Sequence, residues 1–295
     1  MVDAFLRRTL TQYPLDFTPD LRRLKPWPSL KDSLWRQPYL IELTYADNFR
    51  RVEDSIRGRN LKILEVGCGT GFMSLELARM GHDVVGIDPN DKIIRIARRT
   101  METDPYGKSR GDLRYEIADF NKWSDDPGTY DVVLFSRVLH DLLHPGKILS
   151  RAHHLLKKGG RLICLEYAYD RIDRRAATWL YQIRRALELT GWYSSHLPVD
   201  PREGVDGIMN DALYGRKEHI NKFEEMRHPL EQLFHGEHFS WHCYYCWDVF
   251  REMRIPDQRR EKALAGLFNG MEQLLIDSLE IQPALFHFMG TKATV

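Results

Sequence analysis

A glycine-rich segment and the acids around it are the residues of this sequence best suited to hold a ligand. The segment reads Glu65-Val-Gly67-Cys68-Gly69-Thr-Gly71, follows the apolar run 61–66 and precedes a helical pattern. Glycines between a strand and a helix allow a tight turn and let a ligand lie against the backbone. A dinucleotide site needs the spacing G-x-G-x-x-G, but Phe72 stands where its third glycine would be. The loop therefore predicts a ligand without a pyrophosphate, which disfavours an NAD-dependent dehydrogenase.

Three carboxylates stand where they could recognise the other parts of such a ligand. Glu65 ends the first apolar run, where it would repel a pyrophosphate and could pair with an ammonium group. Asp88 comes about 20 residues after the first glycine, a place from which an acid accepts both hydroxyls of a ribose. It could instead cap the following helix. Asp119 follows a third predicted strand, where it could accept the exocyclic amine of adenine or be an ordinary loop residue. An amine, a ribose and an adenine without phosphate together describe S-adenosylmethionine.

Short apolar runs that alternate with amphipathic helical patterns must position these residues. Strands are predicted over 61–66, 83–88, 112–118, 130–135 and 161–166, and helices over 72–80, 91–100 and 145–157, the last ended by Gly159 and Gly160. Two later strands, 238–247 and 284–289, flank a helix at 258–279. This alternation predicts an α/β fold with a seven-stranded, mostly parallel, Rossmann-like sheet.

Differences in composition and in hydrophobic pattern divide the sequence into four segments. Residues 1–59 are rich in arginine and proline and are predicted to form an N-terminal helical cap. The Rossmann-like core is assigned to 60–167, a helical insertion before the sixth strand to 168–235, and the closing strands and helix of the core to 236–295. The insertion is predicted to cap a substrate, because its aromatic residues suit a small-molecule pocket, although they could equally be the core of a helical subdomain: Trp179, Tyr181, Trp192, Tyr193, Tyr214 and His219.

The sequence resembles the class I S-adenosylmethionine-dependent methyltransferases, in particular their small-molecule branch of ubiquinone-type and O-methyltransferase-like enzymes. Five segments carry the resemblance, in family order: EVGCGTG (65–71), VVGIDPN (84–90), IADF (117–120), YDVVLFSRVLHDL (130–142) and LLKKGGRLICLE (155–166). It implies S-adenosyl-L-methionine as cofactor and S-adenosyl-L-homocysteine as product. It also implies contacts to the methionine moiety, the ribose, the adenine and the sulfonium side, in that order: Glu65, Gly67, Cys68, Gly69 and Gly71; Asp88; Pro89, Asn90, Asp119 and Phe120; Ser136 and Arg137.

His140 is the candidate catalytic residue. It follows the fourth predicted strand in Val138-Leu-His-Asp141, at the edge of the sheet where ligands bind. Methyl transfer from a sulfonium is an in-line displacement, so the protein can contribute positioning and removal of the acceptor proton. The run is similar to that of small-molecule O-methyltransferases, in which this histidine is the base. Ubiquinone-type enzymes often carry VLHH there and their histidine is not always catalytic, so a structural histidine is the alternative.

The acceptor is predicted to be a small molecule methylated at oxygen, nitrogen or sulfur. A net charge of +1, from 43 Lys and Arg against 42 Asp and Glu, disfavours nucleic acid as a partner. Residues 136–139 read SRVL, where adenine-N6 and glutamine methyltransferases carry [DN]-P-P-[YF], and no cysteine stands nearby for cytosine-C5 chemistry. An RNA or protein methyltransferase and a non-catalytic S-adenosylmethionine-binding partner subunit remain the alternatives. The sequence does not indicate an oligomeric state.

The cysteines and the hydropathy predict a reduced, cytoplasmic protein without a metal. Four scattered cysteines are too few for a disulfide framework, no run of about 20 apolar residues could span a membrane, and the N-terminus does not read as a signal peptide. One stretch is rich in histidine and cysteine: His235, His238, His242, Cys243 and Cys246. It holds a single C-x2-C pair, whereas structural zinc needs four ligands, so packing within a strand is expected there.

Overall fold

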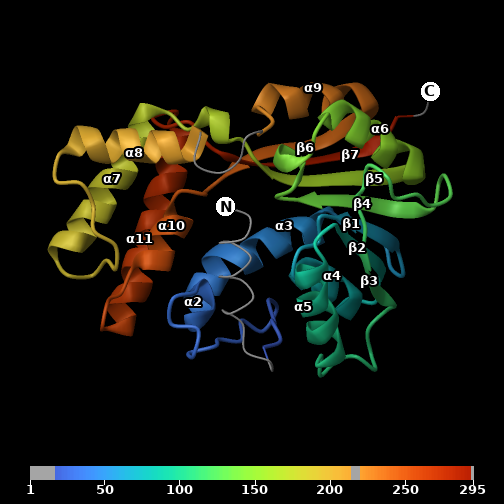
Figure 1. Cartoon of the computed structure of the whole chain (residues 1–295), viewed down its shortest axis with the longest axis horizontal. Helices are drawn as coiled ribbons and strands as arrows, with labels where there is room; N and C mark the ends of the chain where they lie inside the picture. The colour runs from blue at the N-terminus through green and yellow to red at the C-terminus, as the bar shows by residue number, and fades with distance from the viewer. Residues whose placement is uncertain (1–16, 214–219, 294–295) are drawn as a thin grey trace.

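A seven-stranded sheet runs through the described part of the chain, residues 17–213 and 220–293 of the computed structural model (Figure 1). Its order is β3-β2-β1-β4-β5-β7-β6. β1 to β5 run parallel, and β7 pairs antiparallel with both β5 and β6. The predicted α/β fold with a mostly parallel sheet is confirmed. The strands are β1 (Lys62–Val66), β2 (Asp83–Asp88), β3 (Leu113–Ile117), β4 (Tyr130–Ser136), β5 (Leu156–Tyr167), β6 (Phe234–His242) and β7 (Leu285–Lys292).

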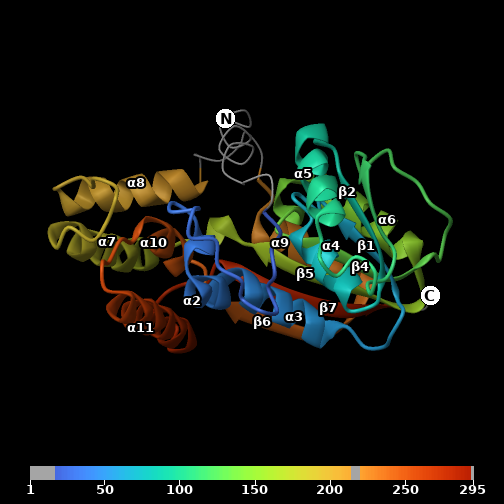
Figure 2. The ribbon, with the colours of Figure 1, turned by 90° about the horizontal axis from the view of Figure 1, so that it is seen from below.

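Helices cover both faces of the sheet (Figures 1 and 2). One face carries α3 (Asp47–Ser55), α4 (Phe72–Arg79) and α5 (Asp91–Glu102), and the other carries α6 (Pro145–Leu155) and α9 (Phe223–Leu233). Neighbouring residues of one strand point to opposite faces, so Ile63 joins the first core and Leu64 the second, and both are fully buried. Burial on both faces explains why the strands read as almost continuous apolar runs.

A group of helices gathers beyond one end of the sheet, at the left of Figure 1. It contains α2 (Pro38–Ile41), α7 (Arg174–Leu189), α8 (Pro201–Leu213), α10 (Cys246–Glu252) and α11 (Gln258–Asp277). Its core takes in Leu40, Leu180, Phe250 and the end of β5 at Tyr167. Short turns join these parts: η1 (Leu34–Arg36), η2 (Glu42–Ala46), η3 (Leu139–Asp141) and η4 (Tyr169–Arg171). None of the described helices is long and apolar enough to cross a lipid bilayer.

Predicted boundaries at the fifth and sixth strands are wrong. The strand predicted to reach residue 247 ends at His242, and α10 begins at Cys246. The buried carboxylate of Glu272 accepts the backbone N–H groups of Tyr244, Tyr245 and Cys246, and so satisfies donors that a helix start leaves unpaired. The helix predicted to reach residue 157 ends at Leu155, because the backbone is already extended at the next residue, where β5 begins. Gly159 and Gly160, predicted to end this helix, therefore lie within β5.

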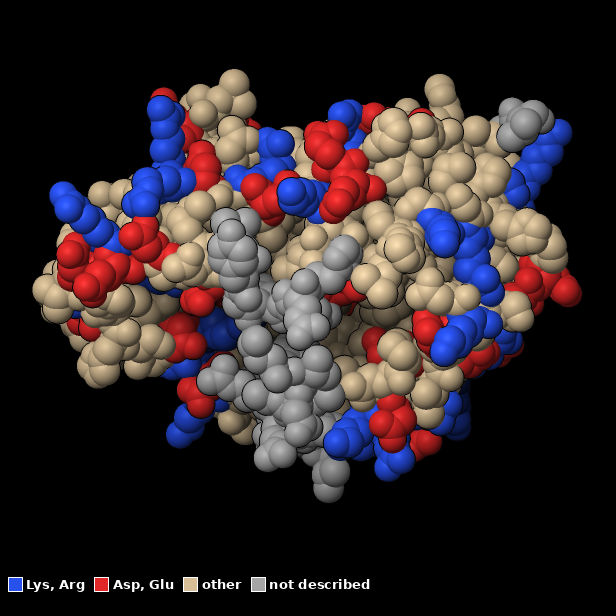
Figure 3. All heavy atoms as spheres, turned by 45° about the horizontal axis from the view of Figure 1, so that its top comes forward, with Lys and Arg blue, Asp and Glu red and all other residues tan. Residues whose placement is uncertain are grey.

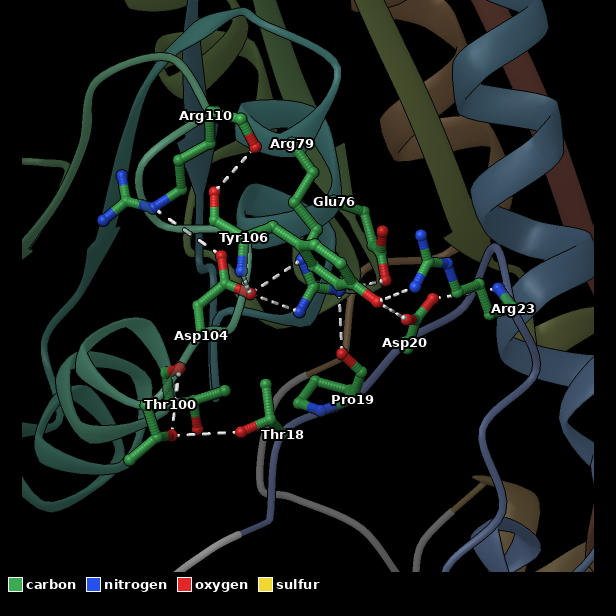
Figure 4. A network of polar contacts seen from close by, with 12 residues as sticks. Thr18, Pro19, Asp20, Arg23, Glu76, Arg79, Thr100, Asp104, Tyr106 and Arg110 are labelled. Carbon is green, nitrogen blue, oxygen red and sulfur yellow. Dashed lines mark hydrogen bonds and ion pairs between the residues drawn. The ribbon is translucent and has the colours of Figure 1, made fainter.

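A polar network holds residues 18–23 against α4 (Figure 4). The guanidinium of Arg79, whose side chain is 6% exposed, lies 2.8 Å from carboxylate oxygens of Glu76 and Asp104. It also donates to the carbonyl oxygen of Pro19 at 2.8 Å, and Glu76 accepts the backbone N–H of Leu21 at 2.6 Å. A buried ion pair of this kind is costly to break on one side only, so the N-terminal segment is fixed to the core here.

Candidate active site

The carboxyl ends of the parallel strands meet at one edge of the sheet, and the predicted ligand-binding residues stand there. Asp88 ends β2, Ser136 ends β4, and the glycine loop leaves β1. The strand order reverses between β1 and β4. Open α/β sheets bind their ligands at such a reversal, outside the carboxyl ends of the strands.

The glycine loop has a backbone that side chains would obstruct. Gly67, Gly69 and Gly71 have φ of +69°, +53° and +77°, in the left-handed region. A Cβ atom at Gly67 would lie 2.3 Å from Cγ2 of Val138, and one at Gly71 would lie 2.4 Å from the hydroxyl oxygen of Tyr115. No described atom lies within 4 Å of the corresponding position at Gly69. The loop is therefore packed tightly at both ends and leaves space above its middle glycine.

Hydrogen bonds to Tyr115 and to β2 hold this loop in place. The Tyr115 hydroxyl donates to the carbonyl oxygen of Gly71 at 2.8 Å, and the N–H of Cys68 donates to the carbonyl oxygen of Ile87 at 3.0 Å. Burial raises the pKa of the Cys68 thiol well above its ordinary value. Cys68 therefore stays a neutral thiol at the loop, unsuited to act as a nucleophile.

Glu65 is a buried carboxyl group directly beneath the loop, with 2% of its surface exposed. Burial raises its pKa to about 7, although the Ser74 hydroxyl, which donates to it, and the charge of Arg137 act in the opposite direction. The nearby Asp88 adds to the rise. Glu65 is thus divided between its acid and its carboxylate forms near neutral pH.

Asp88 faces the glycine loop. Its Oδ2 accepts the N–H of Gly69 at 3.2 Å and its Oδ1 accepts the N–H of Asn90 at 2.9 Å. The cap of α5 is Asn90, whose side chain accepts the N–H groups of Lys92 and Ile93. The capping role weighed for Asp88 thus belongs to Asn90, and Pro89 between them is exposed.

Asp119 and Phe120 follow β3, the neighbour of β2. The N–H of Ala118 donates to the carbonyl oxygen of Asp88 at 3.1 Å, which brings the two strand ends together. Asp119 is half-buried and accepts the N–H of Asn121 at 2.9 Å. Phe120 is 2% exposed, with its ring centroid 6.0 Å from that of Phe135 in the hydrophobic core. The polar side chain of Asp119 therefore lies beside the end of β2, whereas the ring of Phe120 is buried in the hydrophobic core behind it.

Arg137 follows Ser136 with a φ of +59°, which costs a residue with a side chain about 1–2 kcal/mol. Its guanidinium carbon lies 5.8 Å from the ring centroid of Tyr45 and 5.7 Å from that of Trp247. Burial alone would lower the pKa of Arg137, but the surrounding tyrosines, Tyr167 foremost, raise it above its ordinary value. The strained backbone thus directs a permanent positive charge between aromatic rings.

His140 lies in η3 and is held by a buried carboxylate. Its Nδ1 lies 2.8 Å from Oε2 of Glu166, which is fully buried at the end of β5, and its Nε2 lies 3.6 Å from Oδ2 of Asp141. Glu166 also accepts the N–H groups of Val138 and Leu139, at 2.5 and 2.7 Å. A carboxylate at Nδ1 favours the tautomer with the proton on that nitrogen, in which the lone pair of the neutral ring lies on Nε2.

Aromatic rings and one amide surround this histidine. The centroid of the His140 ring lies 5.5 Å from that of Tyr167 and 5.3 Å from that of Tyr169, and Tyr244 lies 4.8 Å from Tyr167. Asn221, 2% exposed, donates to the carbonyl oxygens of Leu139 and Leu142, and so ties the end of the insertion to the histidine turn.

Of the aromatic residues predicted to line the site from the insertion, those that the structure describes pack within the helical group, whose core also includes Tyr167, Tyr169 and Tyr244. Trp179, Trp192 and Tyr193 pack against the core of the helical group, and Tyr181 packs between α7 and α8. Tyr214 and His219 lie outside the described residues. Sequence reasoning missed the tyrosines around His140, and also Tyr115, Asn221 and Glu166. Glu166 could have been found from the sequence, because it is the last residue of the predicted strand 161–166. That strand is the next one along the chain after the strand that leads to His140.

The histidine- and cysteine-rich stretch forms a polar cluster on β6 and β7. Ser240 links His238 and His242 by hydrogen bonds of 2.7 and 2.8 Å, and Ser55 lies 3.1 Å from Nε2 of His287. In the part of the chain that the structure describes, no three His, Cys, Asp or Glu side chains are arranged to hold a metal ion.

Together, the fold and the loop define the class of protein: an α/β protein with a glycine loop at the carboxyl ends of its parallel strands. Residues 36–235, more than half of the chain, match the family described as "Methyltransferase domain". The chain belongs to this family. It is an S-adenosylmethionine-dependent methyltransferase, as the sequence predicted.

Curated relatives and a solved structure agree with this assignment. The ubiquinone biosynthesis O-methyltransferase of Cereibacter sphaeroides is 30% identical over 179 residues, 61% of this chain and 67% of that protein. The mitochondrial ubiquinone biosynthesis O-methyltransferase of Mus musculus is 34% identical over 103 residues, 35% of this chain and only 27% of that protein. An S-adenosylmethionine-dependent methyltransferase of Mesorhizobium loti superposes with a TM-score of 0.53 over 85% of this chain and all of that one, at 16% identity, which shows the shared fold.

Proposed function

We propose that this enzyme methylates a hydroxyl group of a small molecule, with His140 as the general base. The contact between His140 and the buried carboxylate of Glu166 supports this most directly, because it stands at the edge of the sheet beside the glycine loop. The bound cofactor supplies an activated methyl group on a sulfonium. The protein then has to align the acceptor and remove its proton.

The residues at the loop fit S-adenosylmethionine. We assign Gly67, Cys68, Gly69 and Gly71 to the backbone that lines the methionine moiety, since the loop leaves space above Gly69. Glu65 would take the ammonium group. Asp88, oriented by two backbone N–H groups, would accept the ribose hydroxyls.

The remaining assignments concern the adenine and the sulfonium. Pro89 and Asn90 would flank the adenine, and Asp119 would accept its amine. Phe120 would contribute only the apolar wall behind Asp119, because its ring is buried among core residues. Ser136 and Arg137 would face the sulfonium side.

The surroundings of Arg137 favour an acceptor with an aromatic or flat apolar frame and a negative charge. Arg251 lies one helical turn after Trp247 on α10, so both side chains project from the same side of that helix. Burial alone would lower the pKa of Arg251, but Asp248, whose carboxylate lies 4.0 Å from the guanidinium of Arg251, raises it, and Tyr45 and Tyr167 raise the pKa of both Arg137 and Arg251. Arg137, a permanent cation between aromatic rings, would hold an anionic aromatic molecule, and Arg251 stands further out, partly paired with Asp248.

The four sequence segments fit this arrangement. Residues 60–167 would bind the cofactor, 236–295 would complete the sheet, and the described parts of 1–59 and 168–235 would close over the acceptor. Phe17 and Trp35 support the first cap: their rings contact Phe72, the first residue of α4, with centroids 5.7 and 5.5 Å away. The cap is thereby packed beside the glycine loop.

A labelled-methyl experiment tests the proposal. The enzyme is incubated with S-adenosylmethionine carrying a deuterated methyl group and an extract that holds metabolites, RNA and protein. Label in a molecule of low mass is expected. Basic and acidic side chains are interspersed over the face in Figure 3, which gives no single-sign surface for a nucleic acid. Label confined to RNA or to protein would overturn the proposal in favour of that substrate.

Variants then test the base. His140→Ala is expected to lower kcat for the identified acceptor by about 10²–10⁴-fold. Glu166→Gln should lower kcat and alter its pH profile while the affinity for S-adenosylhomocysteine is retained. His154→Ala, at an exposed position on α6, is the matched control and should leave kcat unchanged. A loss below about threefold in His140→Ala would assign His140 a structural role and favour an amine or thiolate acceptor.

A further inference from the structure

The long helix α11 carries an exposed apolar stripe. One side of the helix is buried against the helical group through Glu261, Ala265, Glu272 and Ile276. The opposite side exposes Leu267 (54%), Met271 (39%) and Leu274 (67%). In Figure 1 this helix lies at the lower left of the molecule, and it also contacts β6. Three large apolar side chains in a row on such a helix mark a surface for a partner.

The spacing of this stripe is that of a two-helix seam. The exposed residues Arg260, Ala263, Leu267, Gly270, Leu274 and Asp277 follow one another at alternating steps of three and four residues. This alternation is the spacing of the a and d positions of a coiled coil, with the apolar residues Ala263, Leu267 and Leu274 in the middle and charged residues at both ends.

The stripe is also complementary to itself in the antiparallel direction. An antiparallel copy related by a two-fold axis between Phe268 and Asn269 sets each of these six residues opposite another of the six, and sets Met271 opposite Gly266. Leu267 then faces Gly270, Met271 faces Gly266, and Leu274 faces Ala263. No described atom lies within 4 Å of a Cβ built at Gly266 or Gly270, so both leave room for a large side chain.

The charges at the two ends match in the same register. The pairing sets Arg260 of one helix opposite Asp277 of the other, and the reverse. Within one chain, Arg260 lies 3.8 Å from Asp257, and Asp277 accepts from Gln273 at 2.8 Å. These contacts are exposed and contribute little, so they can be exchanged for contacts between copies.

We propose that α11 is a dimer interface, where the helix pairs antiparallel with α11 of a second copy of this chain. The interface is isologous, since each surface meets its own equivalent around a two-fold axis. One helix pair is at the small end of protein interfaces, which gives a reversible dimer with a micromolar or weaker dissociation constant.

The other side of α11 contacts the N-terminal segment. The buried side of α11 carries Glu261, whose carboxylate accepts from Arg36 at 3.0 Å and from the hydroxyl of Tyr39. Both partners belong to the N-terminal segment that packs beside the glycine loop. Within each copy, α11 therefore lies between the proposed interface and this segment.

Sedimentation velocity over a range of protein concentrations tests the proposal and needs neither cofactor nor acceptor. The wild-type chain is expected to shift from monomer to dimer as its concentration rises. Leu267→Glu should raise the dissociation constant at least roughly tenfold, because it sets a charge in the seam. Leu189→Glu, at a position 71% exposed on α7, is the matched control and should leave it unchanged. A wild-type chain that stays monomeric, or a dimer that survives Leu267→Glu, would overturn the proposal.

A charge exchange fixes the register. Arg260→Asp or Asp277→Arg alone sets like charges opposite each other and should weaken the dimer, whereas the double variant restores an opposite pair and should recover it. Unchanged thermal unfolding shows that each variant still folds. Failure of the double variant to recover would rule out the antiparallel register. If the wild-type chain is monomeric and binds anionic vesicles, the exposed side of α11 is a membrane-binding surface and not a dimer interface.

Discussion

The buried carboxyl group of Glu65 predicts that cofactor binding depends on pH, in a way that can be measured without a known acceptor. Its pKa is raised to about 7 by burial. Only the carboxylate form can pair with the ammonium group of the ligand. The ionised fraction of Glu65 rises about eightfold from pH 5.8 to pH 7.0. This range lies below the ordinary pKa of an α-amino group, about 7.7–8.0, so the ammonium group of the ligand stays mostly protonated. The affinity for S-adenosylhomocysteine should rise by the same factor.

Isothermal titration calorimetry measures this effect in two ways. The dissociation constant should fall about eightfold over that interval. At pH 6.5 binding should also release about 0.8 of a proton per site, which buffers of different ionisation enthalpy reveal. Glu65→Gln keeps the shape of the side chain and its contact to Ser74, so it should bind more weakly and without this pH dependence. Equal pH dependence in the wild-type chain and in Glu65→Gln would refute the assignment of Glu65 to the ammonium group.

Three further predictions concern stability and are checked by urea unfolding. Gly69→Ala should cost about 1–2 kcal/mol for its left-handed backbone, and Gly67→Ala about 1–3 kcal/mol more, because its Cβ would overlap Val138; equal costs would contradict the packing described at the loop. Asn221→Ala removes both hydrogen bonds to the turn that carries His140 and should cost about 1–3 kcal/mol; no loss of stability would show that the turn is stable without these bonds. Burial lowers the pKa of His242 to about 3 and of His287 to about 4, below the value of about 6.5 expected when unfolded. The unfolded chain therefore takes up protons first, and stability should fall below about pH 6.5, by roughly 2 kcal/mol per histidine at pH 5; an equal pH dependence in His287→Gln would contradict this.

The core of the fold could be predicted from the sequence because its signals are local. Each parallel strand is a short apolar run, and the glycine loop and Asp88 directly follow their own strands. The residues that directly follow the parallel strands were therefore expected to lie together at one edge of the sheet, and the structure places them there.

The surroundings of the site could not be predicted, because they join distant segments. Tyr45, Tyr167 and Trp247 lie on a turn of the N-terminal segment, on β5 and on α10, and only the fold brings their rings near Arg137. The start of α10 depends on Glu272, a carboxylate 26 residues further along the chain than Cys246. Neither relation leaves a periodic signal in the sequence.

The central claim, that the glycine loop and Asp88 bind S-adenosylmethionine, is tested most directly by titrating S-adenosylhomocysteine into the wild-type chain and Asp88→Ala. Hydrogen bonds to a charged group contribute about 1.5–3 kcal/mol each, so loss of the ribose contacts should weaken binding at least about tenfold. Asp91→Ala, which removes the exposed carboxylate paired with Arg95 at the start of α5, is the control and should bind as the wild-type chain does. Equal affinity of the wild-type chain and Asp88→Ala would contradict the account.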